Sequence, residues 1–334
     1  MNKKLLTVAV AAGVAATSLA AIADVNVYGR VQAEWVSLEN SAGLDQSEVN
    51  DPGMSRWGIK ATEDLGNGLT GIAVLEYSAE PADSGAEGNR QQFVALKGNF
   101  GTVAMGTFNG VYKSIGAALD PFNATFLEAR HNGGQAGGAY GNSGFLNSGI
   151  AWMSPTVSGI SAQVIVIDES ASGAGNDWQA AVQYKNGPMW GFIAHSENVG
   201  DGLNGTDASL TKIGGRMSMA NHTFWVQWED DDGGLNAPTS RTDLASTGIA
   251  DPGTADGDIL LIGYQMKLGK NAIVVQWGDS DYDTAAGSGN YMSIGARHSF
   301  SKTTSIYGGW RQTENDTAGT NDIDVFGFGI RKDF

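Results

Sequence analysis

The sequence predicts an all-β fold, a transmembrane antiparallel β-barrel of about sixteen strands, and three observations carry that prediction. Segments of about ten residues alternate between apolar and polar side chains along most of the chain. Glycine is abundant, with 48 residues against 7 prolines, which suits tight turns and disfavours helices. Beyond the N-terminal region no apolar stretch is long enough for a membrane-spanning helix, so the chain is either soluble or crosses a membrane with strands.

The N-terminus is predicted to be a secretory signal peptide that is removed on export. Lys3 and Lys4 precede an apolar stretch that is too short for a membrane span, and the small-residue pattern Ala21-Ile22-Ala23 offers a cleavage site. We therefore expect two parts, a leader over residues 1–23 and a single barrel domain over residues 24–334.

The first predicted strand, Val25–Leu38, shows the alternation clearly. Val31 and Trp35 fall on one face of it, whereas Arg30 and Glu34 fall on the other, because successive strand side chains point to opposite faces. One face suits lipid and the other suits water. We therefore expect the polar face to line the inside of the barrel.

The strands follow one another as hairpins. Leu65-Gly66-Asn67-Gly68 lies between two alternating runs, and Asn-Gly at such a place is a strong hairpin signal. Tight turns and longer polar loops alternate along the chain, as they do in outer-membrane barrels. The predicted strands are Val25–Leu38, Ser55–Asp64, Leu69–Ser78, Gln91–Gly98, Thr102–Asn109, Phe145–Ser154, Ile160–Glu169, Asp177–Lys185, Met189–Asn198, Ala208–Met219, Thr223–Asp230, Asp258–Leu268, Ala272–Asp279, Tyr291–Ser299, Thr303–Thr313 and Asp322–Phe334.

Aromatic side chains gather near the ends of these strands. Trp178 and Tyr184 share one predicted strand, and Phe224 and Trp228 share another. Girdles of aromatic residues at both interfaces are typical of membrane barrels. The chain ends in Phe334, which closes an alternating strand with a terminal aromatic residue.

Composition excludes several classes of function. The chain has no cysteine, so a disulfide, a thiolate metal site and a cysteine nucleophile are all excluded. Its net charge of −16 argues against nucleic acid as a partner, because phosphate binding needs a basic face. No cofactor and no metal site are expected: the run Asp279–Asp283 begins like a calcium loop, but Thr284 replaces the required glycine and Asn290 the closing glutamate.

A set of motifs lies along the alternating segments: Val25–Arg30, Ser55–Lys60, Glu63–Leu69, Phe93–Val103, Asn147–Pro155 and the terminal Phe334. With these motifs the chain resembles the general porins of Gram-negative outer membranes over essentially all of residues 24–334. The resemblance implies a non-enzymatic channel for passive diffusion of small hydrophilic solutes. It also implies a homotrimer, contacts with outer-membrane lipid and lipopolysaccharide, and recognition of Phe334 by the barrel-assembly machinery.

The resemblance further implies that the third extracellular loop, here Gly110–Gly144, folds into the lumen and sets acidic residues against a basic wall. Asp120, which begins the sequence Asp120-Pro121-Phe122, and Glu128 are the expected acids. Arg56 stands at the family's basic position on the second strand. The other basic side chains expected to face the lumen are Lys60, Arg30, Arg90, Arg297 and Arg311.

The sequence also departs from the family's pattern. Thr107 and Gly144 stand where many members place an arginine, so the basic side of the constriction is expected to be thinned. Acidic clusters in the long loops would enrich cations at the mouth of the channel. Together these features predict weak cation selectivity.

Three alternatives compete with a general diffusion channel. A substrate-selective porin would need a dedicated track of aromatic and charged residues. A hydrolase would need a serine or aspartate placed with a histidine, but His195 and Ser196 are adjacent on a strand and point to opposite faces. A secreted all-β adhesin or lectin would have to expose a continuous band of valine, isoleucine, phenylalanine and tryptophan to water.

Overall fold

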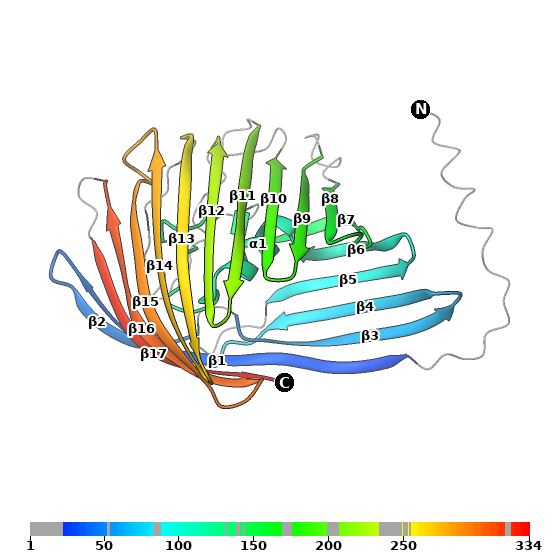
Figure 1. Ribbon diagram of the computed structural model, residues 1–334, viewed down its shortest axis with the longest axis horizontal. Helices are drawn as coiled ribbons and strands as arrows, with labels where there is room; N and C mark the ends of the chain where they lie inside the picture. The colour runs from blue at the N-terminus through cyan, green and yellow to red at the C-terminus, as the bar shows by residue number, and fades with distance from the viewer. Residues whose placement is uncertain are drawn as a thin grey trace.

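A single antiparallel sheet contains most of the residues that the computed structural model describes (Figure 1). The described residues are 23–51, 54–82, 88–130, 132–137, 141–142, 144–168, 176–198, 207–233, 249, 253, 255–317 and 322–334. The predicted signal peptide, apart from Ala23, lies outside them. The strands are β1 Asp24–Asn40, β2 Asp45–Asn50, β3 Arg56–Gly66, β4 Leu69–Ser78, β5 Asn89–Gly98, β6 Gly101–Asn109, β7 Phe145–Met153, β8 Ile160–Ile167, β9 Trp178–Asn186, β10 Met189–Asn198, β11 Ala208–Met219, β12 His222–Asp232, β13 Gly257–Leu268, β14 Asn271–Tyr282, β15 Gly289–Ser299, β16 Thr304–Asn315 and β17 Ile323–Asp333.

The sheet closes on itself as a barrel. From β3 onward each strand pairs with its neighbours in the sequence, and β17 returns to pair with β1 over residues 30–40. On its other edge β1 pairs with β3 over residues 24–30 and with β2 over residues 34–39. Since β2 and β3 lie end to end along β1, they occupy one position, and the barrel has 16 strand positions, as predicted.

The two faces of the barrel differ as the alternation predicts. On β1, Gln32 and Glu34 point inward and are buried, whereas Val27 and Val31 point outward and are exposed. The same outward pattern continues to Phe328 on β17. An apolar outer face and a polar inner face suit a barrel surrounded by lipid.

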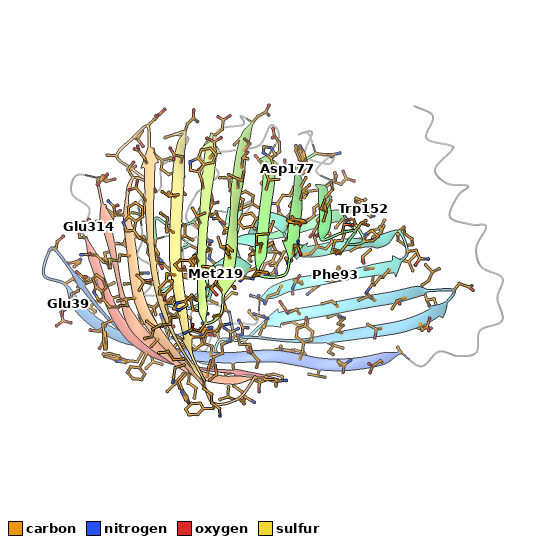
Figure 2. The ribbon with its side chains drawn as sticks, in the orientation of Figure 1. Glu39, Phe93, Trp152, Asp177, Met219 and Glu314 are labelled. Atoms are coloured by element: carbon orange, nitrogen blue, oxygen red, sulfur yellow. The ribbon has the colours of Figure 1, made fainter. Side chains whose placement is uncertain are left out.

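The two ends of the barrel differ in their connections. At one end the strands are joined by tight turns, such as Gly66-Asn67-Gly68, where all three residues have the positive φ that this turn requires. At the other end longer loops follow strand ends that carry acids: Figure 2 shows Glu39, Asp177 and Glu314 there, and Met219 beside a tight turn. The predicted tight turns are therefore present.

Several strands extend further toward the loops than predicted. β12 continues to Asp232 and β14 to Tyr282, where the prediction ends them at Asp230 and Asp279. β2 was missed altogether, because Asp45–Asn50 is polar and carries no apolar alternation. A strand is defined by the pairing of its backbone. The hydrogen-bonded ladder can therefore extend beyond the apolar band, regardless of the charge of the side chains.

The connection between β6 and β7 is called here the β6–β7 segment and comprises described residues 110–130, 132–137, 141, 142 and 144. It begins with helix α1 (Val111–Leu119), which lies against β9, β10 and β11 (Figure 1). Among the described residues no helix is both long and apolar enough to cross a membrane. The side chains of Phe122, Phe126 and Leu127 in this segment are fully buried and belong to the hydrophobic core.

Inward-facing side chains from several strands hold this segment. The Tyr291 hydroxyl of β15 donates to the carbonyl oxygen of Leu127, and Glu34 of β1 accepts from the backbone N–H of Phe126. On β12, Glu229 accepts a 2.6 Å hydrogen bond from the Tyr112 hydroxyl. The segment is therefore tied to strands that lie far apart around the barrel.

Candidate functional site: a basic cavity inside the barrel

A cavity of about 360 Å³ lies between the β6–β7 segment and the inner wall formed by β1, β3, β4, β5 and β17. We call it the basic cavity, because five cationic and two acidic side chains line it. The cations come from β1, β3, β5, α1 and β17, and the acids come from β4 and the β6–β7 segment. The charged residues are Arg30, Arg56, Arg90, Lys113, Arg331, Glu76 and Asp120.

Glu76 on β4 is shared by two arginines. Its Oε1 lies 2.8 Å from Nε of Arg90, and its Oε2 lies 3.4 Å from Nε of Arg56 and accepts a hydrogen bond from the Tyr28 hydroxyl. One carboxylate therefore faces two guanidinium groups. This corner of the cavity keeps a net positive charge.

A β-bulge brings Arg90 into this group. The register between β4 and β5 shifts after Leu75, so that β5 holds an extra residue between Asn89 and Gln92. A bulge re-aims the side chains around it. As a result Arg90 and its neighbour Gln91 both line the cavity, which simple alternation does not allow.

A second carboxylate repeats this arrangement at the end of β17. Oδ1 of Asp333 lies 2.7 Å from Nε of Arg30, and its Oδ2 lies 3.5 Å from Nε of Arg331. Again two arginines share one acid. Side-chain exposure is 22% for Arg56, 19% for Arg331 and 13% for Arg30, so an ion in the cavity can reach these guanidinium groups.

Lys113 faces the cavity from α1. Its Nζ donates a 3.0 Å hydrogen bond to the carbonyl oxygen of Gly144 and lies 4.1 Å from the centre of the Phe145 ring. Burial, together with the positive charges of Arg130 and Arg90, lowers the pKa of Lys113 well below its usual value. Lys113 is therefore the cation of the cavity whose charge is lost first as the pH rises.

Asp120, an expected acid of the constriction, stabilises the fold of its own segment. Its Oδ1 accepts a 2.7 Å hydrogen bond from the backbone N–H of Phe122, and its Oδ2 accepts a 2.9 Å bond from that of Ala129. The residue is only 3% exposed. Burial raises the pKa of Asp120 to about 6 despite these hydrogen bonds.

Glu128, the second expected acid, lies outside the cavity lining and is compensated within the segment. It forms a 3.0 Å salt bridge with Arg130 and accepts a 2.8 Å hydrogen bond from the backbone N–H of Ala124. It is 2% exposed. Neither predicted acid therefore presents an open carboxylate to the cavity.

The remaining predicted basic residues fall in two groups. Arg297 donates to the carbonyl oxygen of Pro121, and the fully buried Arg311 donates a 2.8 Å bond to the Asn132 side chain, so both hold the segment against the wall. Lys60 lies on the same face of β3 as Arg56, but it is exposed and outside the cavity lining.

Three charged residues of the cavity were missed by the sequence prediction. Glu76 and Arg331 both follow from strand alternation, because each lies an even number of residues from inward-facing positions on its own strand. Lys113 has no such signal, because its orientation depends on how α1 packs inside the barrel.

Phe334 closes the seam between the two ends of the chain. Its backbone N–H and carbonyl oxygen form hydrogen bonds of 3.0 and 2.9 Å with the backbone of Gly29 on β1. Its ring occupies the space in which a Cβ on Gly29 would stand, only 2.4 Å from the ring edge. A terminal aromatic residue therefore packs where β1 offers no side chain.

Comparison with known proteins identifies the family. A model of the Gram-negative porins matches residues 7–318. The chain belongs to the Gram-negative porin family. It is thus an outer-membrane β-barrel and, like the other porins, a channel and not an enzyme.

Individual porins agree with this assignment. The chain is 29% identical to the major outer membrane protein P.IB of Neisseria lactamica, across 97% of this chain and 98% of that protein. It is 34% identical to P.IB of Neisseria gonorrhoeae over 55% of this chain and 54% of that protein. Among solved structures, the anion-selective porin from Comamonas acidovorans superposes with a TM-score of 0.76 at 20% identity, covering 94% of this chain and 100% of that chain. The trimer form of OmpT from Vibrio cholerae gives a TM-score of 0.65 at 14% identity, covering 93% and 99%.

Proposed function

We propose that this porin is a passive diffusion channel for small hydrophilic solutes, and that its route is narrowest at the basic cavity, where the β6–β7 segment is folded into the lumen. The observation that carries the proposal is the set of contacts between this segment and inward-facing side chains of β1, β12 and β15. A cavity remains between the segment and the wall formed by β1, β3, β4, β5 and β17. Solutes would pass on that side.

We further propose that the channel prefers anions. Five cations against two acids line the cavity, and each of Glu76 and Asp333 is shared by two arginines. Fixed charges in a narrow passage act strongly on passing ions. The name of the Comamonas protein, an anion-selective porin, is in keeping with this proposal.

The sequence predicted the opposite, weak cation selectivity, and the comparisons do not support that prediction. Its premise was that Thr107 and Gly144 leave the basic wall thinned. Arg90, Lys113 and Arg331 supply cations from other elements. The acidic loops at the mouth count for less, because at physiological salt charges more than about 8 Å away are largely screened.

The reversal potential of the purified channel in a planar bilayer tests this proposal. With a potassium chloride gradient across the bilayer, we expect the sign that corresponds to a chloride preference, and we expect the preference to grow as salt is lowered. A potassium preference at low salt would contradict the proposed selectivity. Point substitutions suit this channel better than a deletion within the β6–β7 segment, because Phe122, Phe126 and Leu127 of that segment belong to the core.

We also propose that the channel assembles as a homotrimer after removal of residues 1–23 and recognition of Phe334 by the assembly machinery. The trimer form of OmpT supports the oligomer, and the exposed apolar outer wall supports contacts with neighbouring copies, lipid and lipopolysaccharide. Unboiled protein should migrate as a trimer on a denaturing gel and boiled protein as a monomer. An intact mass that includes residues 1–23 would contradict the cleavage.

A further inference from the structure

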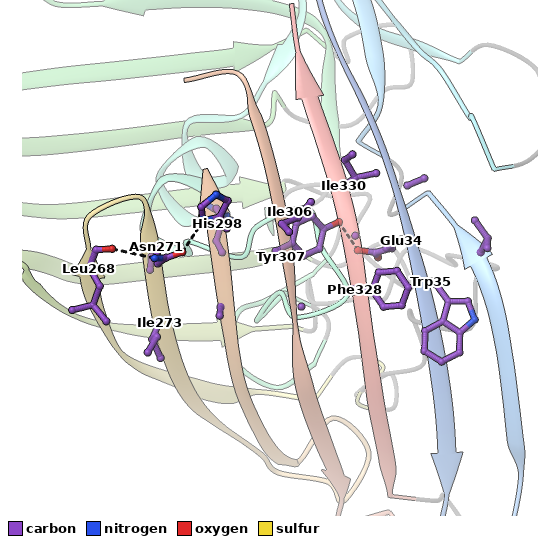
Figure 3. A pocket seen from close by; sticks show the side chains of 17 residues that line it. Glu34, Trp35, Leu268, Asn271, Ile273, His298, Ile306, Tyr307, Phe328 and Ile330 are labelled. Carbon is purple, nitrogen blue, oxygen red and sulfur yellow. Dashed lines mark hydrogen bonds between the residues drawn. The ribbon is translucent and has the colours of Figure 1, made fainter. Parts of the chain in front are cut away.

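An apolar groove of about 1160 Å³ crosses the outer wall of the barrel over β14, β15, β16, β17 and β1 (Figure 3). The register of these strands explains it. Ile273, Ala296, Gly308 and Phe328 stand directly opposite one another on consecutive strands, and all four point outward. The two small residues in the middle of this row form the floor, and the isoleucine and phenylalanine form the walls.

The groove reaches the tight-turn end of the barrel, where its lining becomes polar. Nδ1 of His298 lies 2.7 Å from Oδ1 of Asn271 there (Figure 3). In outer-membrane barrels the tight turns lie on the periplasmic side. The polar end of the groove is therefore at the level of the phospholipid headgroups of the periplasmic leaflet.

Three lysines stand around this polar end. Lys270 occupies the turn before Asn271, and its Nζ lies 3.4 Å from the carbonyl oxygen of Phe300. Lys332 donates a 2.9 Å hydrogen bond to the Thr303 hydroxyl, and Lys302 precedes that residue in the same turn. All three lysines are exposed. The acid next to them, Asp333, is bound to Arg30 and Arg331 instead.

From this arrangement we propose that the groove binds an anionic phospholipid of the periplasmic leaflet. An acyl chain lies on the floor formed by Ala296 and Gly308, and the phosphate lies among Lys270, Lys302 and Lys332. Charge complementarity favours this occupant, because basic side chains at the headgroup level attract anionic lipid. The competing occupant is a second copy of the chain, whose strand β3 carries Glu63 and Asp64 near its tight-turn end.

Native mass spectrometry of the detergent-purified full-length channel tests the site, with phosphatidylglycerol as the probe and zwitterionic phosphatidylcholine as its comparison. The wild-type channel should retain phosphatidylglycerol in preference. The triple variant K270Q/K302Q/K332Q should bind phosphatidylglycerol more weakly, by about fivefold for each lysine removed. Equal retention of the two lipids by the wild type would overturn the proposal.

The matched control is K97Q/K185Q/K267Q, which removes the same charge from the tight-turn ends of β5, β9 and β13, outside the groove lining. It should retain phosphatidylglycerol as the wild type does. Equal loss in both triple variants would show general attraction to a basic rim, and no loss in either would show that the lysines do not bind the lipid. Both results would overturn the proposal.

A variant with a filled groove distinguishes between the two possible occupants, a lipid and a second copy of the chain. Ala296→Phe places a ring on the groove floor and leaves all three lysines in place, so it should reduce phosphatidylglycerol binding without changing the oligomeric state seen in the same spectra. Loss of the oligomer with unchanged lipid binding would assign the groove to a contact between copies. The lysine variants keep the proposal testable should Ala296→Phe fail to fold.

Discussion

Replacing Arg56 with glutamine is the sharpest test of anion preference, because Arg56 has the most exposed side chain of the four arginines in the cavity. In the wild type, Arg56 and Arg90 share the carboxylate of Glu76. Without Arg56 that carboxylate faces one guanidinium group, Arg90, at 2.8 Å. The substitution therefore removes one unit of positive charge and leaves a matched buried pair.

The size of the effect follows from the interaction between one fixed charge and a passing ion. At a separation of about 4 Å this energy is about 1 kcal/mol in bulk water and about 4 kcal/mol at the dielectric typical of a protein surface. We take the lower value because the cavity holds water. Entry of an anion then becomes about fivefold less favourable and entry of a cation about fivefold more favourable. The ratio of chloride to potassium permeability should therefore fall by about 25-fold.

Reversal potentials measure this ratio directly and are best recorded at low salt, where screening is weak. Lys60→Gln is the matched control, since it removes one positive charge from the same face of β3 outside the cavity lining. We expect Lys60→Gln to keep the wild-type reversal potential. Equal shifts in both variants, or no shift in Arg56→Gln, would refute the reasoning.

Three further predictions follow from the structure. Because the pKa of Asp120 is raised to about 6, acidification from neutral pH to pH 5 protonates it and removes a negative charge, so the chloride preference should rise through pH 6. Asp120→Asn should abolish that step, and an unchanged pH profile would show that another group titrates. Gly29→Ala places a Cβ 2.4 Å from the Phe334 ring and should destabilise the barrel by about 1–3 kcal/mol, seen as a lower melting temperature. Gly191→Ala, whose Cβ meets nothing closer than 4.0 Å, should leave that temperature unchanged. Glu229→Gln leaves the fully buried Lys212 without its ion-pair partner and should cost about 3–5 kcal/mol. The double variant Lys212→Met/Glu229→Gln removes the unpaired charge and keeps an acceptor for the Tyr112 hydroxyl, so it should recover most of that loss, and a double variant as unstable as the single one would contradict the assignment.

The barrel could be predicted from the sequence because its determinants are local and repeated. Alternation in β1 separates Val31 from Gln32 by side-chain type alone, and Gly66-Asn67-Gly68 defines its own turn through positive φ angles. The same alternation of apolar and polar side chains recurs in the other strands. An error at one strand end, such as that of β12, therefore does not change the topology.

The cavity was predicted less well because its charges depend on non-local geometry. Arg90 is among the residues expected to face the lumen, but no residue pattern in β5 predicts the bulge that brings it and Gln91 into the same lining. The family resemblance implies that Asp120 is an acid of the constriction, but its carboxylate oxygens accept hydrogen bonds from the backbone of Phe122 and Ala129. Residue type determines the charge of a side chain, whereas the fold determines which other groups lie next to that charge.

This distinction explains how a net charge of −16 is compatible with the anion preference that we propose. Acids at the loop ends of the strands, such as Asp230 and Asp279, raise the negative count but lie outside the cavity lining. Inside the barrel, Glu229 is bound to Tyr112 and Lys212 and Glu128 is bound to Arg130, so these acids hold the β6–β7 segment in place. The arginines on the opposite wall outnumber the carboxylates that they share. Ion preference therefore follows from the unmatched charges that face the passage and not from the total charge of the chain.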